Sequence, residues 1–431
     1  MKIGLCGLGT VGSGTFNVLT RNGGEIAARC GMPIEIVQVA SRRPNPACDL
    51  GSTPFTNDIF AVAENPEVEV LVELLGGTGI ARELIMKAIN NGKHVVTANK
   101  ALIAEYGNEI FALAKEKGVT VAFEAAVAGG IPVIKALREG LAANEINWLA
   151  GIINGTGNFI LTEMRDKGRD FADVLKEAQA LGYAEADPTF DVEGIDAAHK
   201  LTILASVAFG IPLQFEKAYT EGISKVSPDD VQYAEEFGYR IKHLGIAKRL
   251  EHGVELRVHP TLIPDNQLIA KVDGVMNAIV IDGDAAGQTL YYGAGAGAEA
   301  TASAVIADLV DIARASRQGA NVGVPSLGHS DDQLKDLSIV AMEEVVSAYY
   351  LRILVEDHPG VLAKVAQILS EHGINIESIV QKESEQHDGL IPLIMITHRV
   401  LEKNMNHAIA AIESLSDVKE KLMRIRVATL N

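Results

Sequence analysis

A glycine-rich turn directly after an apolar strand is the feature that most restricts how this chain can fold. The strand-like run 2–6 leads into Gly7-Leu8-Gly9-Thr10-Val11-Gly12, where a helical pattern begins. Glycines let the backbone approach a pyrophosphate, and the start of a helix supplies free N–H groups and a positive dipole. The hexapeptide alone is weak evidence, since a glycine turn can also serve tight packing. Its place between strand and helix favours a dinucleotide site at Gly7, Gly9, Thr10, Val11 and Gly12.

The pattern of strands and helices predicts three domains. Residues 1–130 alternate strands (2–6, 34–40, 68–73, 94–98, 119–124) with helices, which indicates a doubly wound parallel α/β sheet. Residues 131–315 change to helices (170–181, 194–209, 228–242) followed by strands (254–262, 278–282), as in an α+β substrate domain. Residues 314–337 are rich in turn-forming residues, so we place a linker at 316–347. The remaining residues, 348–431, have the order βαββαβ.

The residues after the second strand bear on cofactor choice. An NAD-preferring protein usually offers a carboxylate there to the ribose hydroxyls, but this chain has Ser41-Arg42-Arg43. Arg42 and Arg43 can pair with a 2′-phosphate through charge-assisted hydrogen bonds. We therefore predict NADP as the preferred cofactor, with NAD as the alternative if the two arginines are only solvated surface residues.

The bulk composition excludes several classes of protein. With 38 basic and 56 acidic side chains the net charge is −18, which opposes binding to the phosphates of a nucleic acid. No apolar run reaches the about 20 residues of a membrane helix, and the first residues leave no room for a secretion signal. Cys6, Cys30 and Cys48 lack metal or disulfide spacing, so we expect free thiols. These features predict a cytoplasmic protein with a small-molecule substrate and no nucleic-acid or membrane partner.

Several motifs follow one another in order along the first two domains. They are Glu73-Leu74-Leu75-Gly76-Gly77, Val96-Thr97-Ala98-Asn99-Lys100, Gly151-Ile152-Ile153-Asn154-Gly155-Thr156, residues 182–201 and Gly293-Ala294-Gly295-Ala296-Gly297. Residues 182–201 resemble the signature of the homoserine dehydrogenase family through nearly their whole length. The resemblance covers roughly residues 1–315. It implies NAD(P)-dependent, reversible reduction of aspartate 4-semialdehyde to homoserine, a second domain that also dimerises, and a return of residues 293–315 to the first domain.

Charged residues of this signature suit a substrate that has an ammonium and an aldehyde, since these need acceptors and a proton donor. Asp196 and Lys200 are four apart on a predicted helix and share a face, although an exposed ion pair would have the same spacing. By resemblance, Lys200 donates the proton, Glu185 and Asp196 hold the amino group, and Asp191 contacts the substrate or supports the loop. Lys100 resembles a family lysine that lies near the nicotinamide and the substrate. Two lysines so close together, Lys100 and Lys200, should lower each other's proton affinity. Gly295 and Gly297 would belong to the cofactor site.

Two further sites are implied by resemblance. A monovalent cation, usually Na⁺, would be held mostly by backbone carbonyls at Glu124, Val127, Gly129 and Ile131, a stretch that otherwise indicates a glycine bend between domains. Residues 354–376 resemble an ACT domain, which pairs with a copy of itself and binds an amino acid at the interface. Its effector, expected to be threonine, would contact Asp357, Gly360, Val361 and Asn375, although such a domain can serve oligomerisation alone.

Two other functions share parts of this pattern. An aspartate semialdehyde dehydrogenase needs a cysteine nucleophile, but no cysteine follows Cys48. An amino-acid sensor with a degenerate dehydrogenase core is opposed by the intact Lys100, Glu185, Asp196 and Lys200. Since residue 1 already begins the dinucleotide domain, we expect a monofunctional dehydrogenase that forms a homodimer or homotetramer.

Overall fold

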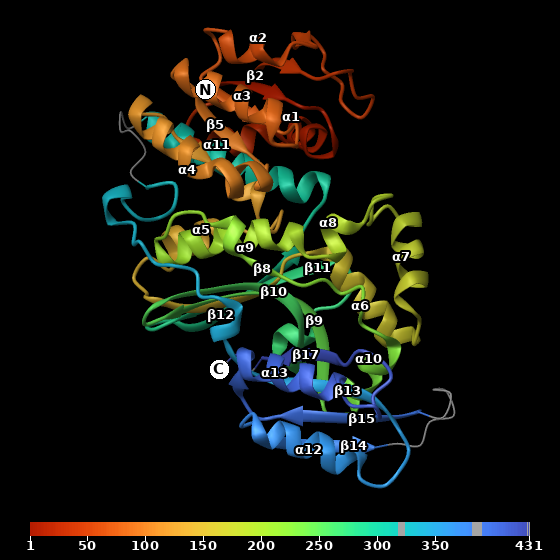
Figure 1. Ribbon diagram of the computed structural model, residues 1–431. Helices are drawn as coiled ribbons and strands as arrows, with labels where there is room; N and C mark the ends of the chain where they lie inside the picture. Colours follow the sequence, from red (N-terminus) through yellow and green to blue (C-terminus); the bar gives the residue numbers. More distant parts are fainter. Residues whose placement is uncertain (318–323, 382–389, 429, 431) are drawn as a thin grey trace.

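The computed structural model describes residues 1–317, 324–381, 390–428 and 430. An N-terminal unit, a central unit and a C-terminal unit are stacked along one direction, with helix α9 (Ile195–Phe209) lying between the first two (Figure 1). The predicted α/β fold class is confirmed. In the described residues no helix is long and apolar enough to cross a membrane.

The N-terminal unit is a six-stranded parallel sheet in the order β3-β2-β1-β4-β5-β6. Its strands are β1 (Lys2–Cys6), β2 (Glu35–Ala40), β3 (Phe55–Thr56), β4 (Val70–Glu73), β5 (His94–Thr97) and β6 (Val121–Ala122). Its helices are α1 (Thr10–Cys30), α2 (Ile59–Glu64), α3 (Gly79–Asn90) and α4 (Lys100–Lys117). The strand order reverses between β1 and β4, and at such a point the carboxyl ends of the strands leave a crevice for a ligand. Strand β6 is shorter than predicted because the chain turns at Glu124 into a 3₁₀ segment, η1 (Glu124–Ala126).

Helix α11 (Ala298–Arg317) returns to this first unit and packs beside α1. Its Val305 and Leu309 share a buried core with Leu5. The predicted start of the linker at residue 316 is wrong, because the helix continues to Arg317. Residues 318–323 lie outside the described part of the chain. Further along, the linker is bound to the central sheet, where the N–H of Val254 donates to the carbonyl of Ser338 at 3.0 Å.

The central unit is a sheet covered on one face by α9. Its strands are β7 (Ile146–Ile152), β9 (Tyr239–Leu250), β10 (Gly253–Pro264), β11 (Met276–Gly283) and β12 (Gly287–Ala294), with the short β8 (Tyr219–Thr220). These strands pair antiparallel except for β8, which pairs in parallel with β10. Its other helices are α5 (Val133–Lys135), α6 (Gly155–Lys167), α7 (Phe171–Ala180), α8 (Thr189–Val192) and α10 (Pro228–Glu236). The helix predicted over 228–242 is too long. It ends at Glu236 because Gly238, with φ of 77°, turns the chain into β9, which pairs with β10 along its whole length.

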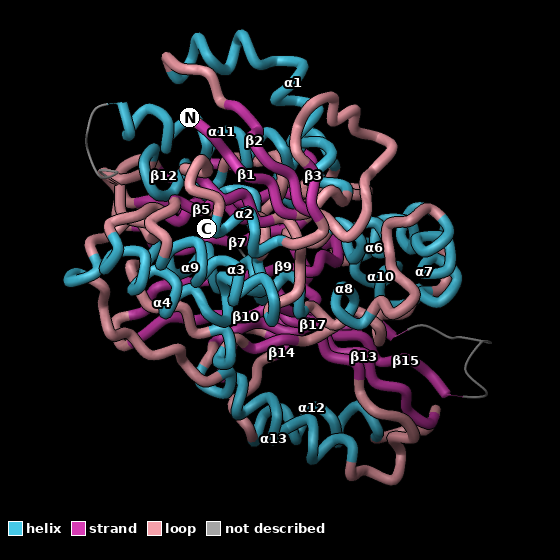
Figure 2. The backbone as a smooth tube through the Cα atoms, turned by 90° about the horizontal axis from the view of Figure 1, so that it is seen from above, coloured by secondary structure: helices cyan, strands magenta, loops and turns pink. Residues whose placement is uncertain are grey.

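The C-terminal unit has the predicted βαββαβ order. It comprises β13 (Val346–Glu356), α12 (Val361–Glu371), β14 (Ile376–Gln381), β15 (Leu390–Thr397), α13 (Glu402–Glu413) and β17 (Met423–Val427), with a short β16 (Val400–Leu401). Helices α12 and α13 lie side by side on one face of its strands (Figure 2). Strand β17 pairs in parallel with β10, so the central and C-terminal strands form one continuous sheet.

Candidate active site

The glycine turn after β1 is closely packed at Gly7 and Gly12 and open at Gly9. Gly7 has φ of 104°, and a Cβ on Gly12 would lie 1.9 Å from the carbonyl oxygen of Gly7. A Cβ on Gly9 would meet no atom within 4 Å. Gly9 also begins α1 without a side-chain cap, which leaves the first N–H groups from Thr10 and Val11 onward available. The residues therefore fit a pyrophosphate group above Gly9.

A cavity of about 1160 Å³ extends from this turn to the end of β2. Arg42 and Arg43 line it, together with Gly9, Thr10 and Ser41. Both arginines are exposed, and neither forms an ion pair with a residue that the structure describes. Two unpaired guanidinium groups thus face the space beside the glycine turn, where the adenosine ribose of a dinucleotide would lie.

A second cavity, of about 610 Å³, brings together residues from the N-terminal and central units. Its lining includes all five residues that the sequence singled out for the substrate and the proton transfer, which are Lys100, Glu185, Asp191, Asp196 and Lys200. From the cofactor and cation predictions it includes Val11, Gly129, Gly295 and Gly297, and its further polar residues include Asn154, Thr156, Asn277 and Thr301.

A buried carboxylate between two lysines forms the centre of this cavity. Asp196, in the first turn of α9, is 4% exposed. Its Oδ2 lies 2.7 Å from Nζ of Lys200, one turn later, and its Oδ1 lies 3.2 Å from Nζ of Lys100. Lys200 also donates to the carbonyl oxygen of Ile153 at 2.7 Å. The Asp196–Lys200 pair is therefore not the exposed ion pair that spacing alone allowed.

Burial and neighbouring charges set the proton affinities of this cluster. Burial would raise the pKa of Asp196, but Lys200 and Lys100 outweigh it and lower that pKa to about 2. The pKa of Lys200 is lowered by burial and by Lys100, against the opposing effect of Asp196. Burial raises the pKa of Asp191, although a hydrogen bond from Asn154 opposes it. Lys200 is thus a stronger acid than a lysine in water.

Asn154 organises the acidic residues and was not singled out from the sequence. Its Nδ2 donates to Asp191 Oδ1 and Asp196 Oδ2, both at 2.8 Å, and its Oδ1 caps α6 by accepting from the N–H of Gly157 at 2.7 Å. The signal for it was its place before Gly155, the usual position of a helix cap. Glu185 differs from the others, because it lines the cavity but its side chain is exposed and forms no hydrogen bond or ion pair with a described residue.

The stretch 124–131 forms a strained turn beside the cavity. Ala128, a non-glycine residue, has φ of 55°. The Glu124 carboxylate accepts from the N–H groups of Ile134 and Lys135 at 2.9 and 2.8 Å, and burial raises its pKa to about 7. The carbonyls of Glu124 and Ile131 each accept a backbone hydrogen bond, whereas those of Val127 and Gly129 have no donor among the described residues. Two free carbonyl oxygens fit a hard cation, and the Glu124 side chain serves the helix that follows.

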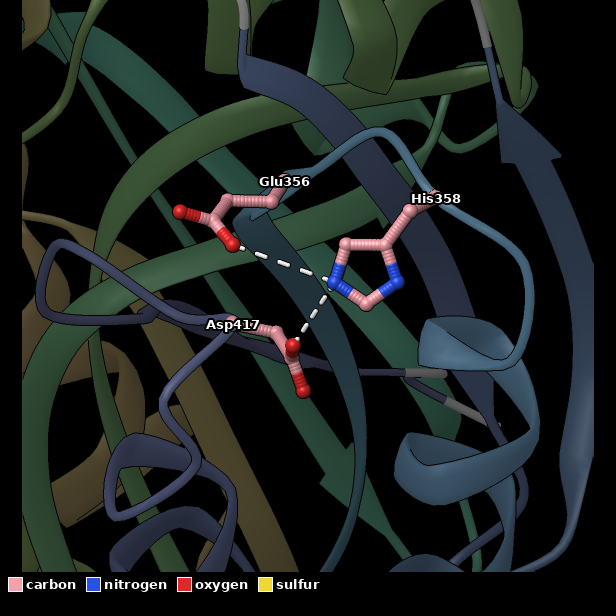
Figure 3. Close-up of side chains that lie close together, drawn as sticks. All are labelled: Glu356, His358 and Asp417. Carbon is pink, nitrogen blue, oxygen red and sulfur yellow. Dashed lines mark hydrogen bonds and ion pairs between the residues drawn. The ribbon is translucent and has the colours of Figure 1, made fainter.

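The turn between β13 and α12 contains three of the predicted effector residues, Asp357, Gly360 and Val361. Gly360, with φ of 99°, begins α12 without a side-chain cap, so the N–H groups from Val361 onward are available. Asp357 is exposed in this turn, whereas Asn375, also exposed, precedes β14 at the other end of the strands, where its carbonyl accepts from the N–H of His398. Figure 3 shows the His358 ring directed at two carboxylates, and its Nε2 lies 2.8 Å from Asp417 and 3.8 Å from Glu356. These contacts tie the turn to the loop before β17.

The dinucleotide cradle and the lysine–aspartate cavity beside it define an NAD(P)-dependent oxidoreductase that acts on a small molecule. Family profiles described as homoserine dehydrogenase NAD-binding domain, homoserine dehydrogenase and ACT domain match residues 7–124, 132–310 and 349–417. The homoserine dehydrogenase of Pseudomonas aeruginosa is 70% identical over 431 residues, with 100% of this chain and 99% of the relative covered. The chain belongs to the homoserine dehydrogenase family.

Solved structures agree with this assignment. A homoserine dehydrogenase from Thiobacillus denitrificans is 61% identical with a TM-score of 0.95, and 100% of this chain and 99% of that chain are covered. A hyperthermophilic archaeal homoserine dehydrogenase in complex with NADPH is 27% identical with a TM-score of 0.61, and 72% of this chain and 97% of that chain are covered. The protein is thus an oxidoreductase that interconverts aspartate 4-semialdehyde and homoserine, and its C-terminal unit is an ACT domain.

Proposed function

We propose that Lys200 is the proton donor of the reduction and that Asp196 and Glu185 hold the substrate ammonium, with Asp191 supporting the same loop. The observation that carries this proposal is the Asp196 carboxylate shared by Lys200 and Lys100 in the cavity. A carboxylate with a pKa of about 2 stays ionised at neutral pH, as an ammonium partner requires.

NAD(P)H, when bound above Gly9, supplies a hydride to the aldehyde carbon. The carbonyl π electrons then become an alkoxide lone pair, which takes a proton from the Lys200 ammonium. Lys100 adds positive charge beside the same oxygen, which stabilises the developing negative charge. Lys200 regains its proton from solvent, because its side chain is 12% exposed. Homoserine and the oxidised cofactor leave.

We also propose a preferred cofactor, a bound cation and an effector. Arg42 and Arg43 support NADP over NAD, and the related archaeal enzyme was solved with NADPH. The free carbonyls of Val127 and Gly129 support a bound Na⁺, with Glu124 and Ile131 offering further backbone oxygens. We propose threonine as the effector at Asp357, Gly360, Val361 and Asn375, in a homodimer or homotetramer.

The function is tested by following NADPH oxidation with aspartate 4-semialdehyde in wild type, Lys200→Ala and the exposed control Lys217→Ala. Loss of a general acid costs about 10²- to 10⁴-fold in rate, so we expect Lys200→Ala to lose at least a hundredfold in kcat and Lys217→Ala to match wild type. Near-normal turnover by Lys200→Ala would show that another group delivers the proton. No turnover by folded wild type would favour the degenerate-sensor hypothesis.

A further inference from the structure

Asn277 is a buried polar residue of the active-site cavity that has no role in the mechanism above. It is the second residue of β11, it is 1% exposed, and it lines the cavity that contains Lys100, Asp196 and Lys200. Its backbone is held by the neighbouring strand β12, in which Gly293 lies opposite Asn277. An amide at such a position needs hydrogen-bond partners, because burying an unpaired polar group is unfavourable.

The side chain is fixed by the glycine turn that leads into α11. A Cβ on Gly295 would lie 2.1 Å from Nδ2 of Asn277, so the amide occupies the space that a side chain at position 295 would need. Gly295 in turn lies against the turn that contains Gly129, whose own Cβ would meet the Gly295 carbonyl oxygen at 2.6 Å. The amide therefore has a fixed position at the junction between the central unit and the helix that returns to the dinucleotide domain.

The hydrogen-bonding capacity of this amide is unused. Its buried Oδ1 has no partner among the described residues. The other carboxamide of the cavity, Asn154, already bonds to two aspartates and a backbone N–H, and the Thr156 hydroxyl donates to the carbonyl of Tyr183 at 2.7 Å. Asn277 is thus the one neutral amide among the described lining residues that is left without a partner.

We propose that Asn277 binds the carboxamide of the nicotinamide ring and so fixes the orientation of the ring. A carboxamide offers one acceptor and two donors, which an asparagine amide complements. The charged parts of the substrate have better partners in the same cavity, because its ammonium suits Asp196 and its developing alkoxide suits Lys200. The proposal rests on the NAD(P) dependence of the family and goes beyond the roles given above.

The test compares two ligands that differ only in the nicotinamide ring. NADPH and 2′-phospho-ADP-ribose are titrated calorimetrically into full-length wild type, Asn277→Ala and Asn277→Asp, and KM for aspartate 4-semialdehyde is measured alongside. Loss of this contact should weaken NADPH about tenfold and leave 2′-phospho-ADP-ribose unchanged. Asn277→Asp keeps the shape of the side chain and loses two donors, so it provides the answer if Asn277→Ala does not fold.

A matched control is Asn158→Ala, since Asn158 is also a buried asparagine and donates to the carbonyls of Val272 and Gly274 just before β11. We expect this variant to bind the two ligands in the wild-type ratio. Equal weakening of both ligands by the Asn277 variants, or no weakening of either, would overturn the proposal. A change confined to KM for the semialdehyde would also overturn it, because the amide would then contact substrate.

Discussion

The proton affinity of Lys200 results from three opposing influences. Burial and the positive charge of Lys100 lower its pKa, whereas Asp196 raises it. Reduction of the aldehyde requires a protonated donor, so its rate falls as the pH rises through this pKa. The neighbours of Lys200 should therefore control where the alkaline limb of the pH profile lies.

Asp196→Asn and Lys100→Met should shift that limb in opposite directions. Without the carboxylate, burial and Lys100 act unopposed, the pKa of Lys200 falls further, and the alkaline limb moves to lower pH. Without Lys100 the pKa rises and the limb moves to higher pH. The measurement is kcat for semialdehyde reduction against pH, which separates this effect from the general loss of activity expected of both variants. Shifts of the same sign would contradict the assignment of the limb to Lys200.

The two arginines after β2 should act on one cofactor only. In Arg42→Ala/Arg43→Ala the contacts to a 2′-phosphate are lost, so KM for NADPH should rise at least about tenfold, whereas KM for NADH should stay the same. Steady-state kinetics with both cofactors measure this, with Arg29→Ala, an exposed arginine at the far end of α1, as the control. An equal rise in KM for both cofactors would mean that the arginines do not bind the 2′-phosphate.

At the scale of elements, the sequence predicts what depends on neighbours along the chain. The doubly wound strands and the βαββαβ unit follow from local periodicity and from glycines such as Gly118, which ends α4. Strands β7, β9 and β12 were missed, because their stability comes from pairing with distant partners, as β9 pairs with β10. For the same reason, nothing local indicated that Asn154 would join Asp191 and Asp196, which lie some forty residues later.

The joint between β10 and β17 contains a buried ion pair that no local pattern predicts. Arg426 is 1% exposed, and it donates to Glu402 at 2.9 Å and to Glu221 of the central unit at 2.7 Å. Arg426→Met leaves the buried Glu402 with only Arg424 and the Tyr349 hydroxyl as partners, so we expect a loss of about 3 kcal/mol in the free energy of unfolding in urea. Arg21→Met breaks an exposed pair with Glu299 and should cost no more than about 1 kcal/mol. Similar small losses for both would show that solvent reaches Arg426.

At the scale of the whole molecule, one segment connects the ACT domain to the catalytic cavity. Glu221 accepts from Arg426 of β17, and two residues later the N–H of Ile223 donates to the carbonyl of Val192, the last residue of α8. That helix carries Asp191, which shares Asn154 with Asp196. A shift of β17 on effector binding would thus reach the acidic residues through Glu221.

This connection predicts that effector binding and inhibition can be separated. Asn375→Ala removes a contact at the proposed effector site, so threonine should bind at least about tenfold more weakly, and inhibition should weaken in proportion. Glu221→Gln keeps the shape of the side chain but weakens the pair with Arg426, so threonine should bind with wild-type affinity and inhibit less, because the coupling between the two sites is reduced.

Calorimetry gives the affinity, and the rate with saturating threonine relative to each variant's own uninhibited rate gives the coupling. If Glu221→Gln were inhibited as fully as wild type, the signal would have to cross elsewhere, and the ion pair between Asp230 of α10 and Arg352 of β13 would be the next contact to test.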